Sequence, residues 1–312
     1  MTTLTFQLYL ARPRGFCAGV DRAIEVVRET LRQYGSPVFV RHAIVHNRHV
    51  VEELEREGAV FVEDTGQIPE GSVAIFSAHG VSPQVRVEAE KRGLRAIDAT
   101  CPLVTKVHLE ARRFAEKGYS ILLIGHRGHV EVEGTLGEAP DHILLIETGE
   151  DAERIEVPDP EKVALITQTT LSVDDTREIA EVLKARFPQI HIPSAKDICY
   201  ATQNRQDAVK ALCKKVEAVI VIGSPASSNS NRLREVAEGA GRRAWLIEEA
   251  NQINPRWLEG ISRLGVTSGA STPESLVQAV ISRLSELGAE SVVELEGEIE
   301  TIRFQLPREL QK

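Results

Sequence analysis

The chain alternates short apolar runs with longer stretches in which apolar residues recur every three to four positions. Seven runs are rich in Val, Ile and Leu: PVFVR (37–41), VAIFS (73–77), SILLI (120–124), HILLI (142–146), VALIT (163–167), AVIVIG (218–223) and LGVTS (264–268). Continuous apolar runs of this length predict parallel strands buried on both faces, and the charged stretches between them predict amphipathic helices. The pattern therefore predicts an α/β fold with mainly parallel sheets.

Three cysteines occupy the same place in this alternation. Cys17, Cys101 and Cys199 each follow a strand-like run and open a predicted helix. Pro102 fits the first turn of the helix that follows Cys101, because proline is tolerated there. Gly35 and Gly118 are typical of helix ends. The repeated position suggests three copies of one structural unit.

The interval from each cysteine to a polar loop is also repeated. A second strand end follows each cysteine after 28 or 29 residues and carries His46, His129 or Ser228. A third strand end in each repeat carries His79, Thr169 with Thr170, or Ser271. Open parallel sheets bind ligands at the carboxyl ends of their strands. We therefore interpret the chain as three pseudo-repeated α/β modules, each presenting one cysteine and two polar loops at the carboxyl ends of parallel strands. If these strand ends turn inward, the three thiols would meet at a common centre.

The repeats predict where the modules begin and end. We expect module 1 at 18–101, module 2 at 102–195, and module 3 at 196–290 together with the N-terminal strand 1–17. Residues 291–312 alternate apolar and polar side chains around a Glu-Gly pair, which predicts a C-terminal hairpin beside the early strand TFQLYL.

Composition narrows the class of protein. The 312 residues are 42% hydrophobic, with no apolar run near the roughly 18 residues of a membrane span and no signal-peptide pattern at the start. We therefore expect a cytoplasmic protein that binds no membrane. Acidic residues outnumber basic ones by 46 to 37 and only 4% of residues are aromatic, which argues against nucleic-acid binding.

The cysteines suggest redox chemistry. Four cysteines in a long cytoplasmic chain are not a disulfide framework, and no C-x-x-C pair forms a zinc knuckle. Three thiolates, one from each module, would hold an iron–sulfur cluster and leave one iron without a protein ligand. The alternative is that each is a small buried apolar residue. Cys213 lies on an apolar helical stripe and is interpreted as packing.

Polar side chains on the same loops favour an anionic ligand. They are His46, His79, His129, Ser227, Ser228, Asn229 and Ser271. Imidazoles and the N–H groups of helix starts bind phosphate oxygens, so these residues suit a compact anion such as a diphosphate. The alternative is that they cap helices, which we prefer for Ser172 and Ser230. Glu131 is either a proton donor in a dry pocket or a solvated loop charge like Glu133.

Two other functions fit some of these residues. In a metal-dependent phosphohydrolase the histidine loops would hold zinc, although no local cysteine or carboxylate completes a site for His46 with His49 or for His126 with His129. A non-catalytic diphosphate sensor would bind the same anion without turnover.

Long segments of the chain resemble a known family. They are PRGFCAGVDRAIEVV, VRHAIVHNRHVV, FSAHGVS, DATCPLVTKVH, IGHRGHVEVEGT, TQTTLSVDDT, DICYATQNRQ, GSPASSNSNRL and GVTSGAS. In this order they resemble the 4-hydroxy-3-methylbut-2-enyl diphosphate reductases, iron–sulfur enzymes of the methylerythritol phosphate route to isoprenoids. The likeness runs from about residue 6 to about residue 308. The resemblance implies that the three modules are arranged as a cloverleaf around a central iron–sulfur cluster. One departure is Val130, where many relatives have proline.

The resemblance implies a role for each candidate residue. Cys17, Cys101 and Cys199 would ligate one [4Fe–4S] cluster per chain, and Glu131 would donate the proton. His129 and Thr169 would lie near the substrate hydroxyl. The diphosphate would be held by His46, His79, Ser227, Ser228, Asn229 and Ser271.

The resemblance also implies a reaction. The enzyme would reductively dehydroxylate (E)-4-hydroxy-3-methylbut-2-enyl diphosphate to isopentenyl and dimethylallyl diphosphate. The two electrons would come from a partner such as a ferredoxin or a flavodoxin.

Overall fold

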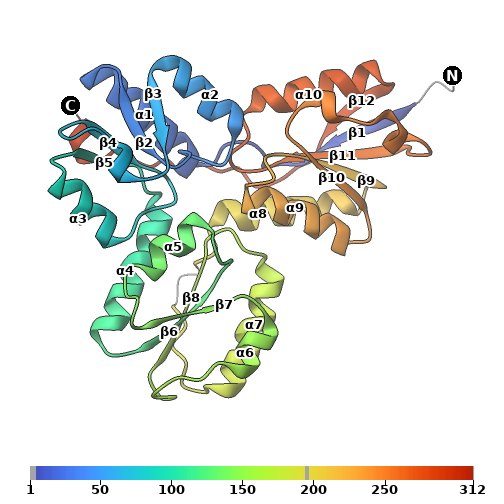
Figure 1. Ribbon diagram of the computed structural model, residues 1–312. Coiled ribbons are helices and arrows are strands. Elements are labelled where there is room, and N and C mark those ends of the chain that lie inside the picture. Colours follow the sequence, from blue (N-terminus) through green and yellow to red (C-terminus); the bar gives the residue numbers. More distant parts are fainter. Residues whose placement is uncertain (1–4, 194–196, 312) are drawn as a thin grey trace. The chain divides into compact units, whose positions relative to one another are not determined.

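A computed structural model describes residues 5–193 and 197–311. Within these residues the named strands form a five-, a four- and a three-stranded sheet, and all their pairings are parallel. Helices alternate with the strands along most of the chain (Figure 1). The prediction of an α/β fold with parallel sheets is confirmed.

The four-stranded sheet is built from the first third of the chain, in the order β3-β2-β4-β5. Its strands are β2 (Val38–Arg41), β3 (Ala59–Val62), β4 (Val73–Phe76) and β5 (Arg95–Asp98). Its helices are α1 (Ala18–Tyr34), α2 (Arg48–Glu57) and α3 (Pro83–Lys91). Gly35 follows α1 with a positive φ of 77°, as its predicted role as a helix end requires.

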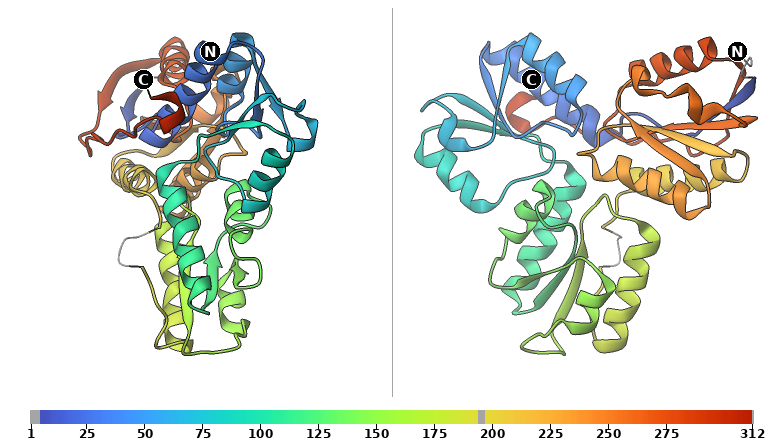
Figure 2. Two further views of the ribbon diagram at one scale, coloured as in Figure 1. Left: turned by 90° about the vertical axis from the view of Figure 1, so that its left-hand side faces the viewer. Right: turned by 45° about the vertical axis from the view of Figure 1, so that its right-hand side comes forward.

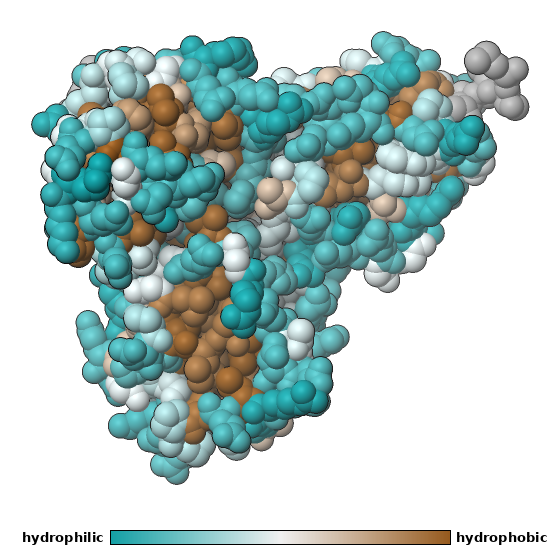
Figure 3. Space-filling model, viewed as in Figure 1, coloured by the Kyte–Doolittle hydropathy of each residue, from teal (hydrophilic) through white to brown (hydrophobic). Residues whose placement is uncertain are grey.

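The three-stranded sheet has the order β7-β6-β8. Its strands are β6 (Ser120–Ile124), β7 (Ile143–Ile146) and β8 (Val163–Thr167). Its helices are α4 (Pro102–Glu116), α5 (Val130–Leu136), α6 (Gly149–Arg154) and α7 (Val173–Arg186). One apolar core joins the sheet to α4 and α5, and a second joins it to α6 and α7, so both faces are covered. In Figure 3 apolar residues reach the surface over β6 and β7, and the middle of the edge strand β7 is only half-buried.

The five-stranded sheet has the order β10-β9-β11-β1-β12. Its strands are β1 (Phe6–Leu10), β9 (Ala218–Ile222), β10 (Arg243–Ile247), β11 (Arg263–Ser268) and β12 (Ala289–Glu294). Its helices are α8 (Tyr200–Cys213), α9 (Ser228–Gly239) and α10 (Glu274–Glu286). Helix α10 covers one face and helices α8 and α9 cover the other (Figure 2). Short 3-10 helices complete the chain at Thr65–Gln67, Ala250–Gln252, Pro255–Leu258 and Arg308–Leu310 (η4).

The C-terminal segment differs from the predicted hairpin. Strand β12 pairs in parallel with β1, and residues 295–307 form no strand. The expected neighbour, the early strand, is therefore right, but the turn is absent. Parallel strands of one sheet need a long crossover connection between them. Helix α10, which lies between β11 and β12 in the chain, supplies it.

The run before Cys199 also differs from its prediction. Residues 188–193 and 197–199 form no strand, and only an isolated parallel bridge joins His191 to Ala164. The predicted boundary between modules 2 and 3, at residues 195 and 196, lies outside the described residues. The predicted module ranges stay a prediction.

By contact density the chain forms two compact units. One contains residues 1–17, 46–50 and 200–302, and the other contains residues 18–45, 51–199 and 303–312. We call them the five-stranded unit and the two-sheet unit. No helix within the described residues is long and apolar enough to cross a membrane.

Candidate active site

Three of the four cysteines stand at helix starts, as predicted. Cys17 and Cys199 directly precede α1 and α8, and Cys101 is the N-cap residue of α4. All three are partly exposed thiols. Cys213, by contrast, is the last residue of α8, is only 3% exposed and packs in an apolar core, where burial raises the pKa of its thiol. The interpretation of Cys213 as a packing residue is confirmed.

The three exposed cysteines also share a backbone contact that the sequence did not reveal. The amide of Cys17 donates to the carbonyl oxygen of Ala270 at 3.3 Å, and that of Cys101 donates to Ala78 at 3.0 Å. The amide of Cys199 donates to the carbonyl oxygen of Thr169 at 3.1 Å. Each acceptor is, or directly precedes, a polar residue predicted at a third strand end. Each cysteine loop is therefore tied to the last polar loop of a different repeat: Cys17 to that of the third, Cys101 to that of the first and Cys199 to that of the second.

The chemistry of these thiols fits an iron–sulfur cluster. A helix N-terminus stabilises a thiolate, which is the form that binds iron. The described residues contain no group of three or more His, Cys, Asp or Glu gathered around one point. Cys17 belongs to the five-stranded unit and Cys101 and Cys199 to the two-sheet unit, so a single site of all three stays a prediction.

Glu131 lies in a buried hydrogen-bonded pair. Glu131 is the second residue of α5 and is only 3% exposed, whereas Glu133 is exposed to solvent. The amide of Thr169 donates to Oε1 at 2.6 Å, and the hydroxyl of Thr169 donates to Oε2 at 3.0 Å. Burial raises the pKa of Glu131 to about 7, although the two bonds from Thr169 oppose the shift because they favour the charged form. Of the two alternatives for Glu131, the geometry favours a proton donor.

Two predicted histidines adjoin this pair. The Nδ1 atom of His129 accepts a hydrogen bond from the amide of Glu131 at 3.2 Å. The rings of His129 and His79 meet edge to face, with 6.0 Å between centroids. The hydroxyl of Ser77 lies 3.2 Å from Nδ1 of His79 and orients that ring. The two-sheet unit thus brings together Glu131, Thr169, His129 and His79.

The other candidate anion-binding residues gather in the five-stranded unit. The hydroxyl of Ser271 donates to the carbonyl oxygen of His46 at 3.1 Å. Asn229 accepts a bond from the amide of Ala270 at 3.0 Å, and Ser227 is the N-cap of α9. Ser228 is the first residue of the same helix. These residues come from three separate segments, at 46, 227–229 and 271.

The start of α9 lies very close to the ends of β9 and β11. A Cβ atom at Gly223 or Gly269 would lie only 2.2 or 2.1 Å from the hydroxyl oxygen of Ser230. Glycine is therefore required at both strand ends for the helix start to approach them. Ser172 caps α7 by accepting a hydrogen bond from the amide of Asp175 at 3.1 Å, as expected. The capping role expected of Ser230 belongs to Ser227 instead; Ser230 lies in the first turn of α9 and its hydroxyl donates to that of Ser227 at 3.1 Å.

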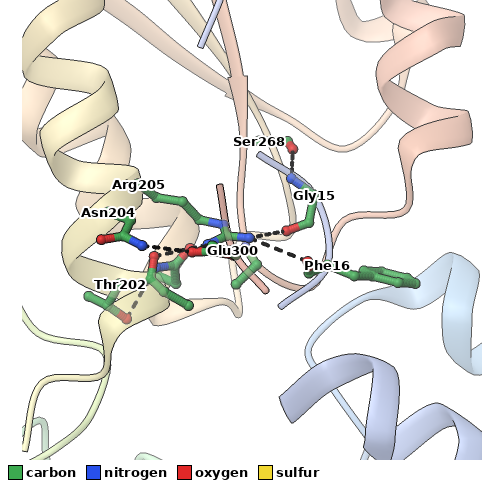
Figure 4. A network of polar contacts seen from close by, with 10 residues as sticks. Gly15, Phe16, Thr202, Asn204, Arg205, Ser268 and Glu300 are labelled. Atoms are coloured by element: carbon green, nitrogen blue, oxygen red, sulfur yellow. Dashed lines mark hydrogen bonds and ion pairs between the residues drawn. The ribbon is translucent and has the colours of Figure 1, made fainter. Parts of the chain in front are cut away.

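Sequence reasoning missed Arg205, a fully buried residue of α8 (Figure 4). Its guanidinium pairs with Glu300 at 2.9 Å and donates to the carbonyl oxygens of Gly15 at 2.7 Å and Phe16 at 3.4 Å. These carbonyls directly precede Cys17. The sequence feature that could have identified Arg205 is its position on the apolar stripe of α8, four residues after Ala201 and four before Val209.

A second missed residue is Asp197. Its carboxylate accepts a bond from Lys106 at 2.8 Å and another from the amide of Thr167 at 2.9 Å. It therefore joins α4, the end of β8 and the loop that carries Cys199. A loop aspartate gives no pattern in the sequence that would single it out.

Comparisons with known proteins identify the family of the chain. The family model described as LytB protein matches residues 8–285. A 4-hydroxy-3-methylbut-2-enyl diphosphate reductase from Aromatoleum aromaticum is 58% identical, with 98% of each chain covered. The "4-hydroxy-3-methylbut-2-enyl diphosphate reductase 2" of Burkholderia mallei is also 58% identical, over 97% of this chain and 93% of that protein.

The fold matches solved structures as well. The E-1-hydroxy-2-methyl-but-2-enyl-4-diphosphate reductase from Plasmodium falciparum superposes with a TM-score of 0.93 at 40% identity, covering 98% of this chain and 97% of that one. A second reductase, titled the terminal enzyme of the non-mevalonate pathway, has a TM-score of 0.63 at 31% identity, covering 90% of this chain and 100% of that one. Because the family model and the relatives span nearly the whole chain, the chain belongs to the LytB protein family, the 4-hydroxy-3-methylbut-2-enyl diphosphate reductases.

Proposed function

We propose that this chain removes the hydroxyl group of (E)-4-hydroxy-3-methylbut-2-enyl diphosphate with Glu131 as the proton donor. Two electrons and two protons convert the substrate to isopentenyl or dimethylallyl diphosphate and water. The buried pair of Glu131 and Thr169 is the observation that carries the assignment of the proton donor. Reductase activity itself is the property of the family to which the chain belongs.

Members of the family carry a [4Fe–4S] cluster. In this chain Cys17, Cys101 and Cys199 would hold it, since each is a partly exposed thiol at a helix start. When bound, the cluster supplies single electrons and an iron without a protein ligand that polarises the C–O bond. The backbone bonds of the three cysteine amides would hold the thiolates in place beside the polar loops.

The proton step follows from the environment of Glu131. Hydroxide is a poor leaving group, but a proton delivered to the oxygen lets it leave as water. With a pKa of about 7, Glu131 is largely protonated below neutral pH and still acidic enough to give up its proton. The amide and hydroxyl of Thr169 then stabilise the carboxylate that remains, because donors bind the ionised form more strongly. His129, whose Nδ1 accepts from the amide of Glu131, would fix the loop during the transfer.

The diphosphate would be held by His46, His79, Ser227, Ser228, Asn229 and Ser271. The oxygen of Ser227 accepts bonds from both the amide and the hydroxyl of Ser230, so its own proton is directed to another acceptor such as a phosphate oxygen. Helix α9 adds amide groups at its start, where an anion is stabilised. Ser271 supports His46 through the bond to its carbonyl oxygen.

Electrons would come from a small redox protein, a ferredoxin or a flavodoxin. Each reduced ferredoxin supplies one electron, so two are oxidised in each turnover.

The test is turnover under anaerobic conditions with reduced methyl viologen as a small-molecule donor. Wild-type protein should form isopentenyl and dimethylallyl diphosphate without releasing phosphate. Glu131→Gln should retain its iron and lose about 10²- to 10⁴-fold in rate, the usual contribution of a general acid. Glu133→Gln, a change of the exposed neighbouring glutamate, is the matched control and should leave the rate unchanged. An unchanged rate in Glu131→Gln would show that the proton comes from another group.

A further inference from the structure

A buried ion pair joins α4, the helix capped by Cys101, to α5, the helix that carries Glu131. Nδ1 of His108, in the middle of α4, lies 2.8 Å from Oε1 of Glu138, which directly follows the C-cap residue of α5. Each of these two side chains is 3% exposed. The other carboxylate oxygen, Oε2, lies 3.2 Å from Nε of Arg112, one helical turn after His108. The pair therefore holds the end of α5 against the middle of α4.

The far edge of the His108 ring contacts the loop of His79, which we define as residues 77–82 between β4 and α3. A Cβ atom at Gly80 would lie only 2.8 Å from Cε1 and 3.3 Å from Nε2 of His108. The ring therefore leaves room for glycine at this position, which also has a φ of 82°. Nε2 is buried and has no hydrogen-bond partner in the part of the chain that the structure describes. This edge of the ring acts on the loop through packing.

Helix α5 packs against the same loop. A Cβ atom at Gly134 would lie 3.3 Å from the carbonyl oxygen of Gly80 and 3.4 Å from Cε1 of His108. A Cβ atom at Gly137 would lie 2.3 Å from the Cβ atom of Ser82. Residues 134 and 137 are three positions apart and therefore lie on one face of the helix. The loop of His79, α5 and α4 thus meet at the ring of His108.

Two candidate active-site residues stand on these elements. His79 directly precedes Gly80, and Glu131 stands three residues before Gly134, one helical turn nearer the start of α5. In the proposed reaction Glu131 addresses the substrate hydroxyl and His79 addresses the diphosphate, which lie at opposite ends of a short butenyl chain. The distance between the loop of His79 and α5 must therefore match the length of the substrate.

We infer that His108 is a positioning residue that sets the distance between the loop of His79 and the helix of Glu131. The inference rests on the proposed function, which places these two residues at opposite ends of the substrate. A carboxylate oxygen only accepts, so Glu138 keeps the proton of His108 on Nδ1 and holds the ring in one orientation. The opposite edge of the ring then spaces the loop. An unpaired nitrogen in a buried ring lowers stability, so an imidazole is a poor choice for packing alone.

The test removes the far edge of the ring and keeps the contact with Glu138. In His108→Asn the amide nitrogen lies as many bonds from Cα as Nδ1 does and still donates, whereas the atoms that contact Gly80 are lost. His142→Asn is the matched control, because Nδ1 of His142 lies 3.2 Å from the carbonyl oxygen of Tyr119 at the amino end of β7. Iron content, melting temperature, kcat and KM are measured on the anaerobically purified holoenzyme with reduced methyl viologen.

The His108→Asn variant should keep its iron and lose about 10- to 100-fold in kcat, because a displacement of about 1 Å at a reacting group has an effect of this size. Its KM should change less than about threefold, since several other groups bind the diphosphate. The alkaline limb of kcat should stay at the wild-type pH, because the burial and the Thr169 bonds that set the pKa of Glu131 are untouched. The His142→Asn control should stay within about twofold of wild type in kcat and KM.

A second variant changes the same distance from the side of α5. In Gly134→Ala the added methyl group would press on Gly80 and His108, each of which would have to move by a few tenths of an ångström. Alanine favours a helix more than glycine does, so the melting temperature should not fall. We nevertheless expect kcat to fall about threefold or more. A slower enzyme of undiminished stability is the result that a purely structural role does not produce.

An unchanged kcat in both His108→Asn and Gly134→Ala would overturn the positioning role. A loss of kcat in His108→Asn that only follows its loss of iron, with a normal kcat in Gly134→Ala, would overturn it as well. A full rate in Glu131→Gln would instead contradict the proposed proton donor, so the two failures are distinguishable.

Discussion

The amide of Cys199 donates a 3.1 Å hydrogen bond to the carbonyl oxygen of Thr169, whose own amide and hydroxyl bind Glu131. One residue therefore links a proposed cluster ligand to the proposed proton donor. A movement of the Cys199 loop would therefore shift Thr169 and, through its hydrogen bonds, the carboxyl group of Glu131. The same residue positions both parts of the reaction, the thiolate and the acid.

Removing the side-chain donor should shift the pH dependence of turnover. The proposed proton donor, Glu131, acts only when it is protonated and has a pKa of about 7, so we expect kcat to fall as the pH rises through 7. The hydroxyl of Thr169 favours the charged form, and Thr169→Val removes it without removing the backbone donor. The pKa of Glu131 should then rise and the alkaline limb should move to higher pH. A limb that stays in place, measured from pH 5.5 to 9 with methyl viologen, would mean that another group titrates.

The raised pKa of Glu131 also has a consequence for stability. Its pKa in the folded chain, about 7, lies above the ordinary value of 4.5, so the folded state holds a proton that the unfolded state releases. Stability that is present below pH 4.5 is therefore lost as the pH rises towards and through 7, by up to about 3 kcal/mol. Glu131→Gln, which carries no charge, should be more stable than wild type at pH 8 and similar at pH 5. Denaturation midpoints at the two pH values check this, and equal differences at both would contradict it.

Serine variants of the proposed ligand cysteines and of Cys213 should differ clearly in iron content. Cys101→Ser removes a proposed ligand at the start of α4 and should abolish or degrade the cluster. Cys213→Ser changes a buried packing residue and should leave the iron content unchanged at a modest cost in stability. Iron determination on both anaerobically purified variants decides the matter. Iron loss in the Cys213 variant would break the assignment of one ligand to each repeat.

Arg205 should support the loop of Cys17. Arg205→Met leaves Glu300 without its partner and removes the donors to Gly15 and Phe16, so we expect a loss of about 3 kcal/mol of stability, as for a broken buried ion pair. The variant should also release its iron faster to a chelator. Arg205→Lys keeps the charge but not the fork of donors and should recover only part of the loss. Normal iron retention in Arg205→Met would show that the network supports the fold and not the Cys17 loop.

Much of the fold was predictable because several of its strands are buried on both faces. Strands β8 and β9 are fully buried along their length and read as unbroken apolar runs. The strands that escaped notice, β3 and β10, lie at sheet edges, and most of their residues are exposed or only half-buried. The C-terminal strand β12 is mostly exposed as well, which is why its alternation resembled a hairpin.

Only part of the candidate site could be predicted from the sequence. Residue type and spacing located the cysteines and the polar loops, because both follow strand ends at regular intervals. The contacts between Cys199 and Thr169, or between Arg205 and Glu300, depend on which loops lie side by side in space. Residues 205 and 300 are 95 positions apart and share no local pattern. Tertiary packing decides such pairs, and a single sequence carries no trace of it.

The most direct test of the central claim is an iron and sulfide determination on the anaerobically purified chain. If Cys17, Cys101 and Cys199 hold one [4Fe–4S] cluster, the protein should be brown and contain four irons and four sulfides per chain. A colourless protein that contains zinc instead of iron, and that releases phosphate from the diphosphate substrate, would contradict the account.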